Sequence, residues 1–451
     1  MMRQSGVVSY QMLLITRLST SLVHCLFFLG RCTQLSYAQD TPDRSDQSAY
    51  SKKHSTSVDG GDTGAEDLGK WRFAPLPSVA YNIERGIGYG AYLTAFKKYK
   101  VPTGERGARY EYSISLALFQ TTKGYQYHKF LFDAPYLTKD RLRLQGILGY
   151  EAQDMSWYSG VGSPVALVET AIKEKRYIHP LQSLWFIPNL TQALTSISPH
   201  LLLSFGWVGR YVFIETPSES LISEERPRGV EGGFLSSAQL SLSWDSRDRE
   251  PDTEQGVWTE FSARGAHQMI GSDWSYFALN FTHRHYVKLS NQPWFVYAYR
   301  LGLDGQIGEQ PFFQRGVMGG VQWTELGGNS VLRSYKFGRF RGDQSLYLSQ
   351  ELRGRVWRLF YKNRPIDLLL CPLLDLGVIR GINEVSRAPI AKSIGRGIWG
   401  SAGLGGRAVY DEGFVVRVDV MWALERVQET SASPARRRSQ LGIFAMTGHS
   451  F

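Results

Sequence analysis

Residues that could form a catalytic or metal site are few and scattered in this chain. The motif G-x-S-x-G, which presents a nucleophilic serine on a sharp turn, does not occur. The nine histidines are spread along the sequence, although His283 and His285 stand two positions apart and would share one face of a strand. They could supply half of a metal site, but no third ligand is close in sequence. We therefore predict no metal, no cofactor and no enzymatic activity.

Gly395, Gly397 and Gly400 match the phosphate-binding pattern G-x-G-x-x-G. That pattern binds phosphate only where a strand precedes the glycines and a helix follows them, because the phosphate lies at the helix N-terminus. The residues around these glycines alternate as they do in a strand, and no helical spacing follows. We interpret the pattern as glycine spacing at the start of a strand.

The composition excludes several classes of protein. Apolar residues make up 43% of the 451 residues, aromatic residues 13% and charged residues 20%, which excludes disordered, collagenous and coiled-coil chains. The aromatic content and the 46 glycines favour β-structure. Three cysteines cannot build a disulfide framework, and a formal charge of +10 is too mild to indicate nucleic-acid binding.

Two-residue alternation is the recurring pattern after position 70. In Val416–Trp422 the even positions are apolar, whereas Arg417 and Asp419 lie on the opposite face. Ser349, Glu351 and Arg353 form a similar polar face in another segment. No run approaches about 18 consecutive apolar residues, so a helical membrane protein is excluded. A soluble sandwich alternates as well, so alternation alone does not separate it from a membrane barrel.

Strand length and aromatic positions favour the membrane barrel. Many candidate strands are long for a soluble sandwich, and pairs such as Trp157-Tyr158 and Trp294-Phe295 lie near strand ends, where interfacial girdles are expected. We predict an all-β, 16-stranded antiparallel transmembrane β-barrel. The candidate strands are about 73–81, 87–99, 109–121, 124–137, 140–154, 173–187, 199–214, 234–245, 256–267, 274–289, 293–307, 344–357, 366–379, 396–409, 413–424 and 439–451.

The N-terminal residues read as a targeting signal and a tail. An apolar core at 22–30 is followed by Ser36-Tyr37-Ala38, which fits a secretory cleavage site before Gln39. We predict a signal peptide at 1–38, with translation starting at Met1 or Met12; a buried N-terminal strand is the alternative. Residues 39–70 are dominated by small and polar types and are expected to form a flexible tail. The barrel domain would then span 71–451.

Four motifs of the barrel region carry a family resemblance. Asp245–Asp248, followed by Gly256, is similar to a hairpin motif of the BamA/TamA-type bacterial surface antigen family of outer-membrane assembly and secretion barrels. Leu326–Tyr335 resembles the loop motif of that family, and Leu373–Gly377 resembles one of its strands. The chain ends in Phe451, as such barrels do.

The resemblance implies a 16-stranded barrel and a long loop that folds into the lumen. It places Arg333 on the inner wall, with Asp375 as the expected carboxylate partner of its planar guanidinium. A simpler interpretation is that this loop only plugs the pore. Ser334 stands where the family has glycine, so we expect a changed loop backbone there, since glycine alone reaches positive φ without steric cost. The candidate site residues are Gly327, Gly328, Leu332, Arg333 and Tyr335 in the loop, Asp375 as ion-pair partner, Asp245, Arg247, Asp248 and Gly256 as a structural hairpin, and Phe451 as an assembly signal.

The implied function is insertion, assembly or export of outer-membrane proteins or related cargo in a bacterial outer membrane. The expected partners are the lipid bilayer, client outer-membrane proteins and a separate periplasmic partner, because the tail is too short for a periplasmic polypeptide-transport-associated (POTRA) domain; no nucleic acid is expected. Alternatives are a passive pore or structural barrel, and a barrel half of a complex.

The family activity is attributed to a weak seam between the first and last strands. Those edges would be about 73–81 and 440–451, and the first contains Pro75 and Pro77, which cannot donate to a ladder.

Overall fold

The computed structural model describes most of the barrel region. The described residues are 70–98, 110–138, 142–162, 164–248, 252–292, 294–320, 324–361, 364–381, 397–410, 414–447 and 449. The predicted signal peptide, all but the last residue of the predicted tail, Gly395 and Phe451 lie outside the described residues.

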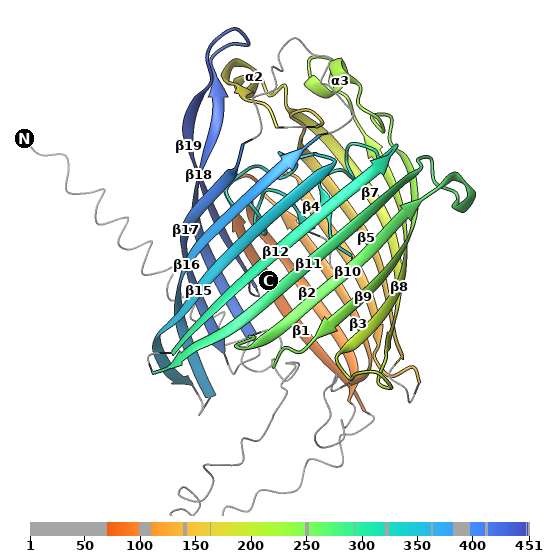
Figure 1. Cartoon of the computed structure of the whole chain (residues 1–451), viewed down its shortest axis with the longest axis vertical. Helices are drawn as coiled ribbons and strands as arrows, with labels where there is room; N and C mark the ends of the chain where they lie inside the picture. Colours follow the sequence, from red (N-terminus) through yellow and green to blue (C-terminus); the bar gives the residue numbers. More distant parts are fainter. Residues whose placement is uncertain are drawn as a thin grey trace, which may run out of the picture.

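Sixteen long antiparallel strands close into one barrel (Figure 1), which confirms the predicted fold class. Each strand pairs with its neighbour in chain order, and the first and last strands meet. The strands are β1 Trp71–Asn82, β2 Gly86–Lys98, β3 Tyr110–Thr121, β4 Tyr125–Ala134, β5 Leu142–Trp157, β7 Ile178–Ala193, β8 Leu201–Ile214, β9 Gly233–Asp245, β10 Gly256–Ala266, β11 Tyr276–Asn291, β12 Trp294–Gly308, β15 Gln344–Tyr361, β16 Arg364–Arg380, β17 Trp399–Tyr410, β18 Phe414–Gln428 and β19 Arg436–Thr447.

Several strand boundaries differ by three to six residues from the sequence-based expectation, and two strands serve as examples. The strand expected at 173–187 begins at Ile178, because Glu169–Lys173 form the short helix α2 after the two-residue strand β6, Leu167–Val168. The strand expected at 439–451 begins earlier, at Arg436, and ends at Thr447.

The other helices of the described residues are short. They are α3, Leu221–Glu225, and a 3-10 turn at Gln268–Ile270. Within the described residues no helix has the length and apolarity needed to cross a membrane.

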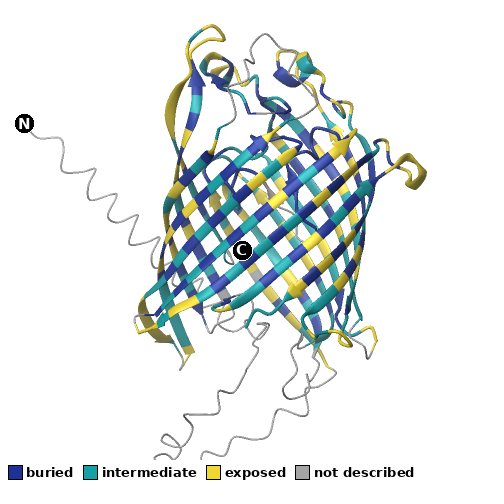
Figure 2. Ribbon diagram, viewed as in Figure 1, coloured by how far each residue is buried: buried dark blue, intermediate teal, exposed yellow. Residues whose placement is uncertain are grey.

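The polarity of the barrel is inverted relative to a soluble protein. Along β8, Phe205 and Phe213 are exposed on the outer face, whereas Ser204 and Arg210 are buried on the inner face. Figure 2 shows the same alternation of exposed and buried residues along the outer strands. Exposed apolar side chains outside and buried polar side chains inside are the pattern of a transmembrane barrel.

The longest connection of the barrel folds into its lumen. We call residues 309–343, between β12 and β15, the lumen loop; it contains the two-residue strands β13, Val317–Met318, and β14, Thr324–Glu325. Antiparallel alternation makes this loop leave the barrel at the end that carries α2, α3 and the β18–β19 hairpin (Figure 1). The chain enters β1 at the opposite end.

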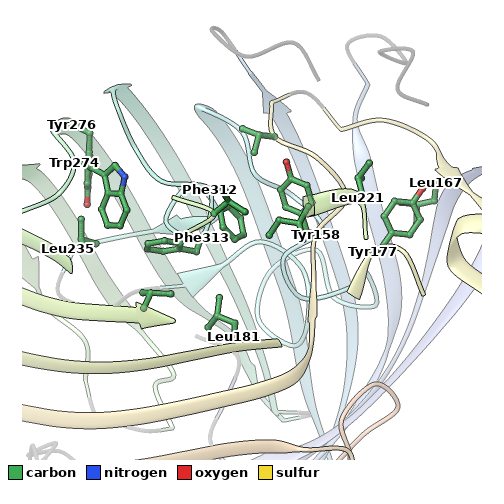
Figure 3. Packing of buried hydrophobic residues seen from close by; sticks show 14 of the residues in the cluster. Tyr158, Leu167, Tyr177, Leu181, Leu221, Leu235, Trp274, Tyr276, Phe312 and Phe313 are labelled. Atoms are coloured by element: carbon green, nitrogen blue, oxygen red, sulfur yellow. The ribbon is translucent and has the colours of Figure 1, made fainter. Parts of the chain in front are cut away.

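An apolar cluster holds the first part of the lumen loop. Phe312 and Phe313 of the loop pack with Tyr158, Leu235 and Trp274, which come from the wall strands and their connections (Figure 3). The Trp274 and Phe313 rings meet edge to face with centroids 5.4 Å apart, an arrangement that aromatic pairs prefer. The loop is thereby fixed inside the barrel before its charged part begins.

Candidate functional site

The predicted loop motif forms a tight turn that depends on positive backbone angles. Gly327 and Gly328 have φ of +94° and +79°, and Leu332 has +50°. Ser334 has φ of +86°. Ser334 therefore adopts the left-handed conformation that glycine reaches without steric cost, and the changed loop backbone expected there stays a prediction. A hydrogen bond from Ser334 Oγ to the Gln440 carbonyl oxygen, 2.8 Å long, holds this side chain.

This turn brings Arg333 onto Asp375. The Arg333 Nε and Nη2 atoms donate to the two Asp375 carboxylate oxygens at 2.8 Å each, and the Arg333 backbone N–H donates to the same carboxylate at 3.0 Å. Both side chains are fully buried. The bidentate geometry fixes the direction of the guanidinium as well as its distance from the wall.

Arg333 also reaches two carboxylates that the sequence motifs did not identify. Its Nη1 lies 3.3 Å from Glu351 Oε1 and 3.4 Å from Asp419 Oδ2. Arg407 bridges the same two acids: its Nη2 is 3.3 Å from Glu351, and its Nη1 donates to Asp419. Arg333 therefore belongs to a network of buried charges.

Further arginines complete what we call the charge cluster. Arg353 Nε lies 3.2 Å from Glu351 Oε2, and Arg417 Nη1 lies 3.3 Å from Asp419 Oδ2. Burial of a charge is tolerated when it is paired and hydrogen-bonded, as these side chains are. The members of the charge cluster are Arg333, Glu351, Arg353, Asp375, Arg407, Arg417 and Asp419.

Strand alternation and two glycines make room for the charge cluster. Its wall members come from four adjacent strands, β15 to β18, and alternation directs them inward. A Cβ on Gly405 would lie 2.5 Å from Arg407 Nη1, so glycine leaves space for that guanidinium. A Cβ on Gly377 would lie 2.9 Å from Leu332 Cδ1. The strand motif Asp375–Gly377 thus supplies both the ion-pair partner and the space for the loop.

Tyr335, two residues after Arg333, also anchors the loop to the barrel wall. Its ring packs edge to face against Phe340 and Trp399, with centroids 5.2 and 5.6 Å away. Its hydroxyl donates toward the carbonyl oxygens of Gly400 and Leu424 at 3.1 and 3.3 Å. This places the last predicted loop residue against the inner faces of β17 and β18.

Other arginines attach the lumen loop to the barrel wall or join two parts of the loop itself. Arg339 forms an ion pair with Glu425 of β18 at 3.0 Å, and Arg315 pairs with Asp343 at the end of the loop at 2.6 Å. Arg341 donates to the Trp157 carbonyl oxygen at 3.1 Å. The loop is held by several charge-assisted bonds spread along its length.

The seam between the first and last strands is short. β1 pairs with β2 along its whole length, from Trp71 to Asn82. In contrast, β1 pairs with β19 only at Tyr81↔Ala445 and Asn82↔Phe444 among the described residues. This register leaves most of the β1 edge without a partner strand in the described part of the chain.

Backbone direction shows which side of β1 the two prolines affect. Ile87 of β2 directs its N–H and C=O toward β3, where Thr122 provides partners at 3.1 and 2.9 Å. Tyr81 lies opposite Ile87, so the Tyr81 backbone groups point away from β2 and toward β19. Pro75 and Pro77 share that direction because it alternates along a strand. They leave the β1–β2 ladder intact and remove two donors from the β1 edge that faces the seam.

The lumen loop contacts the last strand from the inside. The Ser334–Gln440 hydrogen bond joins the loop to β19. A Cβ on Gly442 of β19 would lie 2.8 Å from Ser334 Cα, so this glycine permits the close approach. One edge of the seam is therefore in direct contact with the loop.

The same loop contacts the turn that follows the first strand. Lys336 Nζ lies 3.2 Å from Glu84 Oε1, and the Arg85 guanidinium lies 4.0 Å from the centre of the Phe337 ring. Glu84 and Arg85 connect β1 to β2. Three loop residues, Ser334, Lys336 and Phe337, thus touch the two sides of the seam, and we call these contacts the seam brace.

The predicted hairpin residues stabilise a turn at the opposite end of the barrel. Arg247 binds the Asp245 carboxylate with two donors at 2.9 and 2.7 Å. Asp248 Oδ1 accepts from the Glu254 N–H at 3.1 Å, and Gly256 has φ of +107°. This geometry is that of a structural turn between β9 and β10, and the Thr253 carbonyl oxygen of the same connection accepts from Arg353 of the charge cluster at 3.3 Å.

The other chemical candidates from the sequence are not assembled into a site. His283 and His285 lie on one face of β11, with ring centroids 5.9 Å apart, and bond to Thr259 and Tyr299. Among the described residues there is no group of three or more side chains suited to a metal ion. Trp399 begins β17 directly after the Gly397 region, as the glycine interpretation expected.

Comparison with known proteins provides the family context. The Omp85 superfamily domain matches residues 106–368, more than half of the chain. The structure of BamA from Haemophilus ducreyi lacking POTRA domains 1–3 is similar, with 14% identity and a TM-score of 0.51 over 84% of this chain and 70% of that one. CdiB from Escherichia coli gives 11% identity and a TM-score of 0.51, over 84% of this chain and 63% of that one. No curated protein matches the sequence.

Proposed function

Because the chain belongs to the Omp85 superfamily, we propose that it is an outer-membrane barrel that takes part in the insertion, assembly or export of outer-membrane proteins. The single observation that carries this proposal is the short seam between β1 and β19. An unpaired strand edge within the bilayer leaves N–H and C=O groups without hydrogen bonds, which costs on the order of several kcal/mol per group. Such an edge favours addition of a strand from a client protein.

The two edges of the seam differ in their ability to accept a strand. The β1 edge lacks the donors of Pro75 and Pro77, whereas β19 residues from Arg436 to Ile443 lie beyond the end of β1 in the register. The β19 edge contains no proline in that stretch. We propose that a client strand pairs mainly with the exposed backbone of β19, since no residue that directs its backbone toward this edge lacks a donor.

The remaining assignments follow from the same proposal. Residues 1–38 would act as the signal peptide, 39–70 as a tail, and 71–451 as the outer-membrane barrel domain, with Phe451 as an assembly signal. The bilayer, client proteins and a separate periplasmic partner would be its partners. The role would be non-enzymatic, with the charge cluster fixing the lumen loop and taking no part in bond chemistry.

A disulfide across the seam tests this proposal. Asn82 and Phe444 form a non-hydrogen-bonded pair across the seam. In such a pair the backbone groups point away from the partner strand and the side chains lie close together. We would introduce Asn82→Cys and Phe444→Cys with Cys371→Ala, because Cys371 is a buried free cysteine. Oxidised protein in liposomes should lose stimulation of client-barrel insertion, and reduction should restore it.

A second crosslink provides the matched control. Val79→Cys with Tyr89→Cys joins β1 to β2, which are already paired along their length, so oxidation should leave insertion unchanged. Equal insertion by the oxidised and reduced forms of the seam crosslink would contradict the proposal. A large, steady single-channel conductance without any insertion activity would indicate a passive pore instead.

A further inference from the structure

The lumen holds a cavity on the side away from the charge cluster. It has a volume of about 690 Å³ and lies between the inner faces of β4 to β9 and the lumen loop. That volume is within the range of roughly 300–1,000 Å³ that small-ligand sites occupy. The charge cluster contributes no residue to its lining, so the cavity is separate from that cluster; Gly327 of the loop motif and Arg85 and Phe337 of the seam brace also line it.

The cavity wall carries an aromatic platform of two rings that are tilted by 37° to each other. Trp185 of β7 lies across Gly149 of the neighbouring strand: a Cβ there would be 2.3 Å from the Trp185 ring atoms Cε2 and Cζ2. Tyr127 of β4 lies beside it, with ring centroids 5.6 Å apart. Both residues line the cavity and are only half-buried. Aromatic surface is thus presented to a polar lumen, where its exposure to water is unfavourable.

Cationic side chains flank this platform. Lys129 and Trp185 both pair with Gly149 of β5, and Trp185 pairs with Arg210 on its other side. Lys129 has no carboxylate within ion-pair distance among the described residues. Arg210 is 9% exposed, and its Nε has no hydrogen-bond partner in the described part of the chain.

Polar groups for a hydroxylated ligand lie around the same wall. Gln145, Asn189 and Gln239 line the cavity, and each amide offers both donors and an acceptor. The lining also contains Arg85 and one carboxylate, that of Glu151. Stacking surface, amides and excess positive charge therefore occur together.

We infer that this cavity binds an anionic saccharide, which stacks on Trp185 and Tyr127 and directs its acidic group to Lys129 and Arg210. A pyranose ring has one apolar C–H face for the indole and hydroxyl groups at its rim for the amides. A carboxylate on the sugar would supply the missing counter-charge to Lys129. The inference does not depend on the seam or on client insertion.

An extended peptide fits the same wall less well. β4, β5, β7 and β8 are each paired on both sides, so none of them offers a free backbone edge to a peptide at the cavity. A peptide bound there would lose its backbone hydrogen bonds with water without gaining a ladder. A saccharide requires only side-chain contacts.

Calorimetric titration of the full chain in detergent tests the inference, with trigalacturonate as the anionic probe and maltotriose as the neutral one. Trigalacturonate should bind saturably and more tightly than maltotriose. Trp185→Ala should weaken it about tenfold, the order expected for loss of aromatic stacking, whereas Trp185→Tyr should retain most of the affinity. Lys129→Gln should reduce trigalacturonate affinity toward that of maltotriose.

Trp244→Ala is the matched control, because Trp244 lies exposed on a strand of the same barrel and outside the cavity lining. Retained heat-modifiable gel mobility would show that each variant still folds. Absence of saturable trigalacturonate binding, or binding that Trp185→Ala leaves unchanged, would overturn the inference. So would Trp185-dependent binding of a strand-forming, aromatic-rich peptide in place of the sugar.

Discussion

Arg333 lies close to three buried carboxylates, so its removal should lower the stability of the protein. Asp375 is bound bidentately, while Glu351 and Asp419 are shared with other arginines. Removal of one member from a buried ion network leaves the opposite charges uncompensated. The loop position and the stability of the lumen are therefore coupled through a single side chain.

We predict that Arg333→Ala lowers the free energy of unfolding by about 3–5 kcal/mol, the usual cost of breaking a buried pair. Urea titration in detergent would measure it. Arg358→Ala is the control, because Arg358 also pairs with an aspartate, Asp367, but is 43% exposed. Its loss should change stability by less than about 1 kcal/mol. Equal effects of the two substitutions would show that the charge cluster contributes no special stability.

Substitutions at Ser334 can separate two contributions to stability, namely the backbone strain at this residue and its side-chain hydrogen bond. Ser334→Ala removes the bond to Gln440 but keeps φ positive, so a loss of about 1 kcal/mol is expected. Ser334→Gly removes the same bond and also relieves the strain of about 1–2 kcal/mol that a side chain incurs there. The glycine variant should therefore be the more stable of the two in the same urea titration. The reverse order would mean that the turn is not strained at this residue.

At the residue scale, the sequence predicted the partner that a motif specifies and missed the ones that barrel geometry specifies. Asp375 was predicted from its motif. The sequence placed Glu351, Arg417 and Asp419 on polar strand faces. Alternation predicts which face of a strand a residue lies on, but not its position along the barrel axis. Which charges meet depends on the stagger between neighbouring strands, which the sequence pattern does not encode.

At the scale of elements, the connection between β5 and β7 holds the hairpin that contains the last strand. β6 pairs in parallel with Val427 and Gln428 of β18. Glu169 of α2 lies 3.2 Å from Arg436 and 3.5 Å from Arg438, both on β19. We call the ion pairs of Glu169 with Arg436 and Arg438 the hairpin latch. They connect the last strand, β19, to the β5–β7 connection.

The hairpin latch should depend on pH. The hydrogen bond from Arg436, with added attraction from Lys173 and Arg438, lowers the pKa of Glu169 below its ordinary value of 4.5. A lowered pKa means that the ion pairs contribute fully above the ordinary pKa and that this contribution is lost as the pH falls through the lowered value. The latch should therefore be closed at neutral pH and should open in acid.

Spin labels at Glu174→Cys and Ser431→Cys, with Cys371→Ala, would report the separation of α2 from the hairpin. We expect a short distance at pH 7 that lengthens well below pH 4.5. Glu169→Gln should give a longer, pH-independent distance at both values. A pH response that persists in Glu169→Gln would assign the titration to another group.

Strand boundaries were predicted least well where a short helix lies directly before a strand. The charged run Lys173–Arg176 marks neither a strand period nor a helical one, so the sequence did not show that β7 starts at Ile178 after the five-residue helix α2. A helix of that length has too few residues to show a helical period. The bounds of most other strands were close because glycine, asparagine or aspartate marks their turns.

At the scale of the whole molecule, inverted polarity and a filled lumen limit where the barrel can open. The outer face meets lipid, the charge cluster fixes one wall, and the Phe312 and Phe313 cluster fixes the entrance of the loop. The β1–β19 seam is the weakest strand pairing in the barrel among the described residues, and the seam brace spans it. The long loop and the barrel were expected from the sequence, whereas the brace was not, because it joins residues that no motif connects.

The last prediction concerns that brace. Lys336→Ala with Phe337→Ala removes the side-chain contacts to Glu84 and Arg85, keeps the backbone hydrogen bond from residue 337 to Glu84, and leaves Arg333 and the charge cluster in place. The seam should then open more often, because two register pairs hold β1 against β19 among the residues that the structure describes. In the Asn82→Cys and Phe444→Cys background, oxidative crosslinking should become slower and insertion of a client barrel faster. Lys288→Ala is the control, since Lys288 pairs with Glu254 at 2.6 Å far from the brace. Unchanged crosslinking in the brace variant would show that the loop does not control the seam.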